Sequence, residues 1–351
     1  MQTAIRLVER GLIPEPLLRH GIRRLLRERL RELEDRFGPD PERALESWIE
    51  HMRGAPVALV PELANEQHYE VPPAFFELVL GPRLKYSSGY FPHERATLAE
   101  AEEAMLALTC SRADLRDGMD VLELGCGWGS LSLWMAERYP NSRILAVSNS
   151  APQREHVLAA ARSRGLTNLR VLTRDMNHFE TDERFDRVVS VEMFEHMRNW
   201  EALLTRIARW LRDDGALFLH VFAHREHPYA FEVRDESDWM SRFFFSGGMM
   251  PSHGLVSRLA APLCEQQRWV VSGTHYARTS EEWLANLERR RGAVLELFAR
   301  CYGPDEAQRW YQRWRVFFLA CAELFAYDGG DEWIVSHHLL KHAAARRGES
   351  R

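Results

Sequence analysis

Val121-Leu-Glu-Leu-Gly-Cys-Gly-Trp-Gly129 is the stretch of sequence that decides the fold of this 351-residue chain. Residues 120–124 form a short, mainly apolar run that is typical of a buried strand, and a helical pattern begins directly after the third glycine. Glycine lets the backbone approach a ligand closely, and the N-terminus of a helix attracts a negatively charged group. The stretch therefore predicts a strand, a ligand-binding loop and a helix in succession.

Strands and helices alternate in the same way after this loop. Short apolar runs at 143–147, 169–172, 187–191 and 216–222 read as buried strands, with helical patterns at 130–138, 152–164 and 201–211 between them. Alternation at this spacing predicts an α/β fold, with a mostly parallel sheet covered by helices on both faces. A last apolar stretch, 333–340, is expected to form the antiparallel edge strand of the sheet.

Helical segments flank the predicted sheet. Apolar residues recur at helical spacing over 17–33 with arginines on the opposite face, and a second helix is predicted over 41–52. Two long helical patterns, 280–302 and 304–327, follow an aromatic and charged segment. We therefore divide the chain into an N-terminal helical cover (1–64), a central α/β core (65–225) and a region with a lid, helices and the final strand (226–351).

Composition argues against several classes of protein. With 45% hydrophobic and 28% charged residues, the chain is expected to be globular. A net charge of −5 argues against a dedicated nucleic-acid binder, and no apolar run approaches the roughly 18 residues that span a bilayer. The first residues lack the apolar core of a signal peptide. We expect a cytoplasmic protein that neither binds nucleic acid nor inserts stably into membranes.

Metal and disulfide chemistry are not expected. The five cysteines are odd in number and form no Cys-x-x-Cys pair, which argues against a disulfide framework or a zinc site. The histidine pairs His224/His227 and His337/His338 have no third ligand at a suitable spacing. Cys126, inside the glycine loop, is interpreted as a small packed residue rather than a nucleophile.

The glycine loop resembles motif I of class I S-adenosylmethionine methyltransferases. Its pattern is Gly-x-Gly-x-Gly with Glu123 before it, whereas dinucleotide-binding loops have Gly-x-Gly-x-x-Gly. The resemblance implies a Rossmann-like, mostly parallel seven-stranded sheet and S-adenosyl-L-methionine as cofactor. Asn149 and Gln153 then lie where ribose contacts belong, Asp175 would accept from the adenine amine, and Met176 would lie on the ring. Asn149 is a departure, because most methyltransferases have Asp or Glu there.

Longer motifs extend the resemblance over essentially the whole chain. They are Asn65-Glu-Gln-His-Tyr69, Leu84-Lys-Tyr-Ser-Ser-Gly-Tyr-Phe91, Val191-Glu-Met-Phe-Glu-His-Met197, Arg242-Phe-Phe-Phe-Ser-Gly-Gly-Met-Met-Pro251 and His275-Tyr-Ala-Arg-Thr-Ser-Glu-Glu-Trp283. This set resembles the cyclopropane fatty acid synthase superfamily, and within it the coclaurine N-methyltransferase branch. The arginine-rich composition favours a bacterial relative. The cofactor contacts that the resemblance implies are Tyr86, Ser87, Glu123, Gly125, Cys126, Gly127, Asn149, Gln153, Asp175 and Met176.

Glu192, Glu195 and His196 are the expected catalytic residues. They follow the fourth predicted strand, at the carboxyl edge where open α/β sheets bind ligands. If this segment turns helically, the spacing i, i+3 and i+4 places all three on one face. The resemblance to N-methyltransferases implies that Glu195 and His196 are an acid/base pair, and that Glu192 holds the substrate amine or the pair itself. The alternative is a helix-capping cluster at the surface.

The synthase branch of the superfamily implies a different use of this region. Its bicarbonate-binding set, carried over by position, would be Ser88, Glu195, His220 and Tyr276. The synthases have Cys where this chain has Ser88, which puts cyclopropane synthesis in doubt. Tyr86 and Ser87, with Tyr69, resemble the N-terminal cover that touches the methionine end of the cofactor.

The segment 227–251 lies where the N-methyltransferase branch has its substrate lid. The expected substrate pocket comprises Tyr69, Ser88, His220, Phe222, Phe231, Trp239, Phe243, Tyr276, Tyr327 and Trp333. Acidic residues in the lid, Glu232, Asp235, Glu236 and Asp238, would add negative charge. Aromatic rings rimmed by acidic groups suit a cationic aromatic amine. For any one of these residues, an ordinary role in the core or at the surface is the alternative.

Three hypotheses follow. The first is a soluble S-adenosylmethionine-dependent N-methyltransferase that acts on a small aromatic or cyclic amine of the tetrahydroisoquinoline type. The second is an enzyme that methylates or cyclopropanates unsaturated acyl chains, for which the basic helix over 17–33 could provide membrane contact. The third is a non-catalytic cofactor-binding protein. For the basic helix we favour packing against the catalytic domain or a second subunit, and the helical additions could form a homodimer interface.

Overall fold

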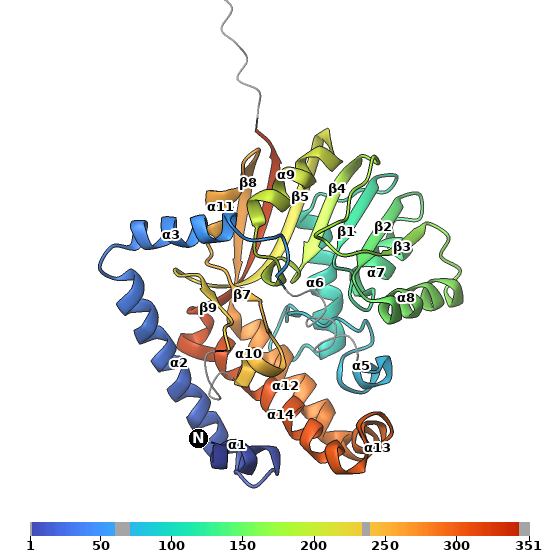
Figure 1. The fold of residues 1–351 in the computed structure, drawn as a ribbon. Coiled ribbons are helices and arrows are strands. Elements are labelled where there is room, and N and C mark those ends of the chain that lie inside the picture. Colours follow the sequence, from blue (N-terminus) through green and yellow to red (C-terminus); the bar gives the residue numbers. More distant parts are fainter. Residues whose placement is uncertain (1, 60–70, 234–238, 344–351) are drawn as a thin grey trace, which may run out of the picture.

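A seven-stranded sheet forms the centre of the computed structural model, which describes residues 2–59, 71–233 and 239–343 (Figure 1). The strands are β1 Asp120–Leu124, β2 Arg143–Ser148, β3 Leu169–Thr173, β4 Phe185–Val191, β5 Leu211–His224, β8 Leu263–Val271 and β9 Trp333–His342. Their order is β3-β2-β1-β4-β5-β9-β8. The first five strands in this order are parallel to one another, and β9 is antiparallel to both of its neighbours, β5 and β8. The predicted mostly parallel, seven-stranded sheet is therefore confirmed.

The prediction for the edge of the sheet is wrong. β9 was expected at the edge, but it lies between β5 and β8, and β8 forms the edge. Residues of β9 from Trp333 to Leu340 are buried, as an interior strand requires. β8 was not predicted, because its middle residues, Glu265 to Arg268, are polar and largely exposed. A half-exposed edge strand lacks the apolar run that marks a buried one.

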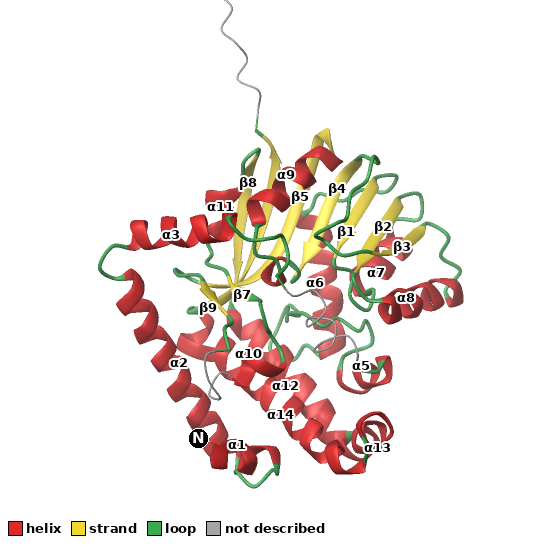
Figure 2. Ribbon diagram, viewed as in Figure 1, coloured by secondary structure: helices red, strands yellow, loops and turns green. Residues whose placement is uncertain are grey.

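Helices cover both faces of the sheet (Figure 2). One face carries α6 Leu98–Arg112, α7 Ser130–Arg138 and α8 Ala151–Ser163, and the other carries α3 Pro41–Arg53, α9 Trp200–Trp210 and α11 Leu255–Leu259. Alternate strand residues serve the two layers: Leu217 and Leu219 pack with α9, whereas Phe218 packs with α6. Side-chain caps start several of these helices, as at Asn199, which accepts from the Ala202 N–H.

A third, aromatic core lies below the carboxyl edge of the sheet in the view of Figure 1. It is built by α2 Glu15–Phe37, α5 Pro73–Val79, α12 Gly273–Arg289, α13 Arg291–Tyr302 and α14 Pro304–Ala326, with α1 Gln2–Glu9 beside them. The remaining short elements are η1 Phe194–His196, β6 Tyr229–Ala230, α10 Trp239–Phe243, β7 Met249–Met250 and η2 Tyr327–Gly330. The pattern over 280–302 predicted one helix, but the chain turns at Arg290 and forms α12 and α13.

The predicted basic helix is α2, and it packs on α14 of the same chain. Arg19 and Arg23 both pair with Glu323, whose side chain is only 7% exposed. Two leucines of the predicted apolar face, Leu17 and Leu25, instead point to solvent, 62% and 53% exposed. None of the described helices is long and apolar enough to cross a membrane.

Trp314→Ala should destabilise the whole protein. Trp314 is fully buried in α14 and contacts Phe75, Phe244 and Phe318, so truncation leaves a large cavity that costs about 3–5 kcal/mol of the free energy of unfolding. Urea unfolding followed by circular dichroism measures this loss. Leu25→Ala, at an exposed position of α2, is the control and should change stability by less than about 0.5 kcal/mol. Equal stability of the two variants would contradict the packing described.

Candidate active site

The glycine loop between β1 and α7 is the first part of the site. Gly125, Gly127 and Gly129 all have positive φ, at 82°, 52° and 82°. A Cβ on Gly125 would lie 2.6 Å from Met193, and one on Gly129 would lie 2.6 Å from Val157, so these two glycines permit close packing. A Cβ on Gly127 would meet no described atom within 4 Å. Gly127 therefore faces open space, as a backbone that cradles a ligand should.

This loop lines two hollows, with about 720 and 600 Å³ of space that includes open solvent. They share Gly125, Gly127, Gln153 and Glu192. All ten predicted cofactor residues line one hollow or the other: Tyr86, Ser87, Glu123, Gly125, Cys126, Gly127, Asn149, Gln153, Asp175 and Met176. The ends of β1, β2 and β3 and the segment before α6 thus bring these residues together at the carboxyl edge of the sheet.

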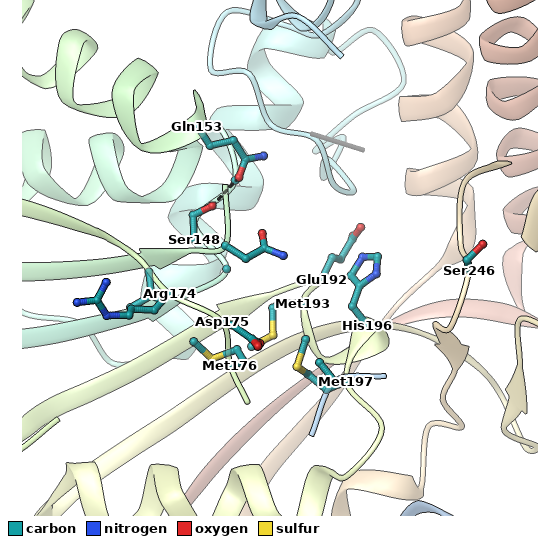
Figure 3. Close-up of a pocket in the computed structure, with 15 residues that line it drawn as sticks. Ser148, Gln153, Arg174, Asp175, Met176, Glu192, Met193, His196, Met197 and Ser246 are labelled. Atoms are coloured by element: carbon teal, nitrogen blue, oxygen red, sulfur yellow. Dashed lines mark hydrogen bonds between the residues drawn. The ribbon is translucent and has the colours of Figure 1, made fainter. Parts of the chain in front are cut away.

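A buried donor on Gln153 indicates that these residues fit a polar ligand. The Gln153 Oε1 accepts from the Ser148 hydroxyl at 2.7 Å (Figure 3). Its Nε2 is buried and has no acceptor within the part of the chain that the structure describes. A buried donor without a partner is costly, and a ligand hydroxyl in the shared space would satisfy it. The donors and acceptors at this edge therefore fit an adenosine-type ligand.

Acidic groups at the same edge are held in place. The Asp175 carboxylate accepts from the Asn177 N–H at 2.9 Å, which leaves it beside Met176 in the lining of the larger hollow. Glu123 accepts from the Ser132 hydroxyl, and burial raises its pKa to about 7. The ligand-facing residues are thus oriented by neighbours before anything binds.

Glu192 is the most constrained side chain of the site. It follows β4 in the left-handed region, with φ at 49°, which is unusual for a residue with a side chain. Its Oε1 accepts from the Ser88 N–H at 3.0 Å and lies 3.1 Å from His220 Nε2. Its Oε2 accepts from the Tyr276 hydroxyl at 2.6 Å. These contacts over-determine the position of the carboxylate and maintain the strained backbone.

Lys85 provides the positive charge near this carboxylate. It is only 3% exposed, and its Nζ donates to the Ser87 hydroxyl at 2.5 Å. Burial raises the pKa of Glu192, and the charge of Lys85 opposes that rise. The pKa of Lys85 itself falls to about 8 because it is buried, so it remains a cation at pH 7.

The predicted shared helical face of Glu192, Glu195 and His196 does not form. The positive φ of Glu192 breaks the helical path, and only Phe194–His196 forms a short 3-10 turn. Glu192 and His196 line the larger hollow side by side (Figure 3). Glu195 is fully buried instead, and its Oε1 accepts from the Phe222 N–H at 2.7 Å. The surface capping alternative does not fit this burial.

Aromatic rings pack beside His196. The Phe245 ring lies 6.0 Å from the His196 imidazole and nearly parallel to it. Phe231 and Phe222 contact Phe245 in turn, at 5.2 and 6.0 Å between ring centroids. In Figure 3, Ser246, the residue after Phe245, lies on the same side of the hollow as His196 and away from Gln153 and Asp175. Two residues of the expected substrate pocket, Phe222 and Phe231, therefore pack on Phe245 beside His196.

Other residues of the predicted pocket lie elsewhere. Trp239 and Phe243 line a separate hollow with Arg6 and Arg313, whose guanidinium lies 4.0 Å from the centre of the Phe243 ring. Trp333 is fully buried and donates its indole N–H to the Tyr229 hydroxyl, with Tyr327 packed edge-on against it. Ser88, His220 and Tyr276 contact the carboxylate of Glu192, which lines the hollow. Tyr69, Asp235, Glu236 and Asp238 lie outside the described residues.

Sequence reasoning missed several residues of the site. Lys85 stands in a motif that we singled out, but a single lysine gives no signal of its burial beside a carboxylate. Ser148, Met193, Met197 and Ser246 line the larger hollow without any chemical signature in the sequence. No group of three or more His, Cys, Asp or Glu side chains among the described residues is arranged to hold a metal ion.

Comparisons with known proteins agree with this geometry. Residues 61–333 match the family model for mycolic acid cyclopropane synthetase. The chain is 37% identical to an (S)-coclaurine N-methyltransferase of Thalictrum flavum subsp. glaucum over 95% of its own length and 94% of the relative. It is 31% identical to cyclopropane mycolic acid synthase 1 of Mycobacterium tuberculosis, over 77% and 95% of the two chains. The crystal structure of a coclaurine N-methyltransferase bound to N-methylheliamine and SAH superimposes with a TM-score of 0.93 at 35% identity, over 97% and 99% of the chains.

Gly127→Ala should weaken binding of S-adenosylhomocysteine. A side chain at this φ strains the loop and enters the hollow, so we expect the Kd to rise at least about ten-fold, equivalent to roughly 1.4 kcal/mol. Isothermal titration calorimetry measures this change. Gly165→Ala is a matched control, because Gly165 also has a positive φ and open space around its Cβ but lies after α8, away from the loop. Equal Kd values for the two variants would contradict the assignment.

Proposed function

This chain belongs to the mycolic acid cyclopropane synthetase family, and we propose that within it the chain is an N-methyltransferase of small aromatic or cyclic amines. It is an S-adenosylmethionine-dependent methyltransferase, as its relatives are. The cofactor supplies an electrophilic methyl group on a sulfonium. Beyond the family and the cofactor, we propose the nucleophile: an amine nitrogen of the tetrahydroisoquinoline type rather than an alkene.

One observation supports an amine rather than an alkene as the nucleophile: the Glu192 carboxylate is hydrogen-bonded to three of the four groups expected to bind bicarbonate. The Ser88 N–H, His220 Nε2 and the Tyr276 hydroxyl all converge on it. A carboxylate fixed to the chain uses the donors that a free bicarbonate would need, and a second anion beside it would be repelled. The arrangement favours a reaction whose base belongs to the protein. It disfavours the bicarbonate-dependent route to cyclopropanes.

Methylation of an amine needs a lone pair, so the amine must lose its proton to a base. The nitrogen lone pair then forms the new N–C bond while the C–S bond breaks and the sulfur keeps that electron pair. Glu192 is placed to attract the ammonium form of the substrate. Burial lowers the pKa of His196 to about 4, so its imidazole is neutral at pH 7. The charge of Glu192 opposes this lowering and makes the imidazole a better proton acceptor.

The geometry favours Glu192 over Glu195 as the carboxylate partner of His196. Glu192 and His196 line the hollow, whereas the Glu195 carboxyl accepts from the Phe222 N–H and is fully buried. Burial raises the pKa of Glu195 well above its usual range, which favours the neutral form of this carboxyl. We therefore assign Glu195 a supporting role, in which it holds the turn that carries His196 against β5. Phe245 beside His196 offers a ring face to a cationic amine.

Labelled S-adenosylmethionine should give methylated product with amines. We expect turnover with a panel of tetrahydroisoquinolines and none with vesicles of unsaturated phospholipid, read by scintillation counting and mass spectrometry of the products. Heat-denatured enzyme provides the background for both substrates. A mass gain of one methylene in the lipid, with no methylated amine, would instead establish the acyl-chain reaction. Cofactor binding without turnover on either substrate would favour the non-catalytic alternative.

Glu192→Gln and His196→Ala should each lower kcat on an amine by roughly 10²–10⁴-fold, the usual loss when an acid–base group is removed. The Kd of S-adenosylhomocysteine should change little, since its predicted contacts remain. Glu195→Gln is the matched comparison, because glutamine can still accept from the Phe222 N–H. We expect a smaller loss there. A larger loss in Glu195→Gln than in Glu192→Gln would reverse the assignment and restore Glu195 as the partner of His196.

A further inference from the structure

Three further side chains connect Glu192 to the end of helix α6. Arg112 is the last residue of α6, His337 lies in β9 and His220 lies in β5. The two histidines are directly opposite each other in the β5–β9 register, and both are fully buried. Their rings point to the α6 face of the sheet, the same face as Phe218 and Leu339 two residues away on each strand.

Short polar contacts join these groups in series. Arg112 Nη1 lies 2.8 Å from His337 Nδ1. His337 Nε2 lies 3.0 Å from His220 Nδ1, and His220 Nε2 lies 3.1 Å from Glu192 Oε1. Each histidine thus uses both of its ring nitrogens within the series. The contacts run along the α6 face of the sheet, from a partly exposed arginine to the carboxylate of the candidate active site.

The chemistry of arginine gives this series one direction. A guanidinium has only donors, so His337 Nδ1 must accept. A neutral imidazole has one donor and one acceptor, so His337 Nε2 carries the proton and donates to His220 Nδ1. By the same reasoning His220 Nε2 donates to Glu192. Burial holds the pKa of both histidines well below the usual range, and the charges of Arg112 and Lys85 add to this effect, so both rings are neutral.

We propose that Arg112 and His337 are positioning residues that lock His220 in its Nε2–H tautomer and so hold Glu192 as a hydrogen-bonded carboxylate. Without Arg112, either tautomer of the histidine pair satisfies their mutual contact, and only Glu192 selects between them. Because burial raises the pKa of Glu192, its protonated form could then donate to His220 and reverse the pair. In the reversed pair, His220 would turn a lone pair toward Glu192, which would leave a buried carboxylate with one donor fewer. The effect on turnover rests on the proposed function, whereas the tautomers do not.

A second consequence concerns the path of the substrate proton. Arg112 cannot accept a proton at any pH at which the protein is folded, so the series ends in a group that only donates. The groups that act on Glu192 are Ser88, Lys85, His196, His220 and Tyr276, and its charge also acts on Glu195 and Cys321. Of these, His196 is the neutral base that also lines the hollow. A proton taken from the amine therefore leaves on the side of the hollow, not along the series from His220 to Arg112.

Nitrogen-15 NMR of histidine-labelled protein tests the tautomers directly. Signals of the two histidines are identified by their loss in His220→Gln and His337→Phe. Between pH 6 and 8 we expect both rings to be neutral, with a protonated Nε2 and a bare Nδ1. In Arg112→Met the tautomers should become mixed, whereas Arg112→Lys, which keeps a donor, should preserve them. An Nδ1–H tautomer or an imidazolium in either ring of the unmodified protein would overturn the proposal.

Kinetics on an amine substrate test the effect on the reaction. Arg112→Met and His337→Phe should lower kcat at least about ten-fold with little change in KM, because a histidine held in the wrong tautomer can no longer support its carboxylate partner. His337→Gln should recover part of the rate, since its amide can both accept from Arg112 and donate to His220. Unchanged kcat in His337→Phe would refute the positioning role.

His338→Gln is the matched control for these variants. His338 is the next residue of β9 and is equally buried, but it contacts Ser336 and Glu265 instead of the series. Its replacement should leave kcat nearly unchanged while thermal unfolding reports any loss of stability. Equal losses of kcat in His338→Gln and His337→Phe would mean a structural role only. If the protein methylates no amine at all, the proposed function fails, but the NMR result still decides the tautomers.

Discussion

A buried carboxylate, that of Glu192, is the constraint on which the rest of the site depends. Such a group is stable only when donors surround it, and here the donors come from three regions of the chain: Ser88 before α6, His220 in β5 and Tyr276 in α12. Lys85 adds a buried positive charge nearby. The segment before α6, the sheet and the C-terminal helices therefore meet at one side chain. Its left-handed backbone is kept in place by the same contacts.

The same carboxylate is the basis of our proposal for the nucleophile. The relatives include proteins named as cyclopropane synthases and proteins named as N-methyltransferases. The shared fold therefore does not indicate which nucleophile accepts the methyl group. In this chain the groups expected to hold a bicarbonate hold Glu192, and His196 beside it faces the hollow with Phe245 alongside. A protein-bound base next to aromatic rings is the arrangement that our proposal of amine methylation depends on. The series from Arg112 through two histidines extends this constraint to the far end of α6.

Much of the fold could be predicted because local pattern and burial agree. The strand over 120–124 and the helix over 130–138 match the structure, and all ten residues predicted to contact the cofactor line the hollows beside the glycine loop. β8 was missed because its exposed edge is polar, and β9 was misplaced because an apolar run does not reveal its neighbours. The aromatic pocket was predicted as one set, yet Phe231 packs on Phe245 beside His196 while Trp239 and Phe243 turn to another hollow.

The sequence by itself determined which chemistry is available: a glycine loop for the cofactor, and glutamates and a histidine at the end of a strand. Periodicity and residue type carry that information because they act locally. Only the tertiary structure decided which glutamate faces the hollow, since the positive φ of Glu192 turns Glu195 toward β5. The contact between His337 and His220 likewise depends on strand order, which joins residues 117 positions apart. Such pairings arise from the packing of distant segments, and no local pattern records them.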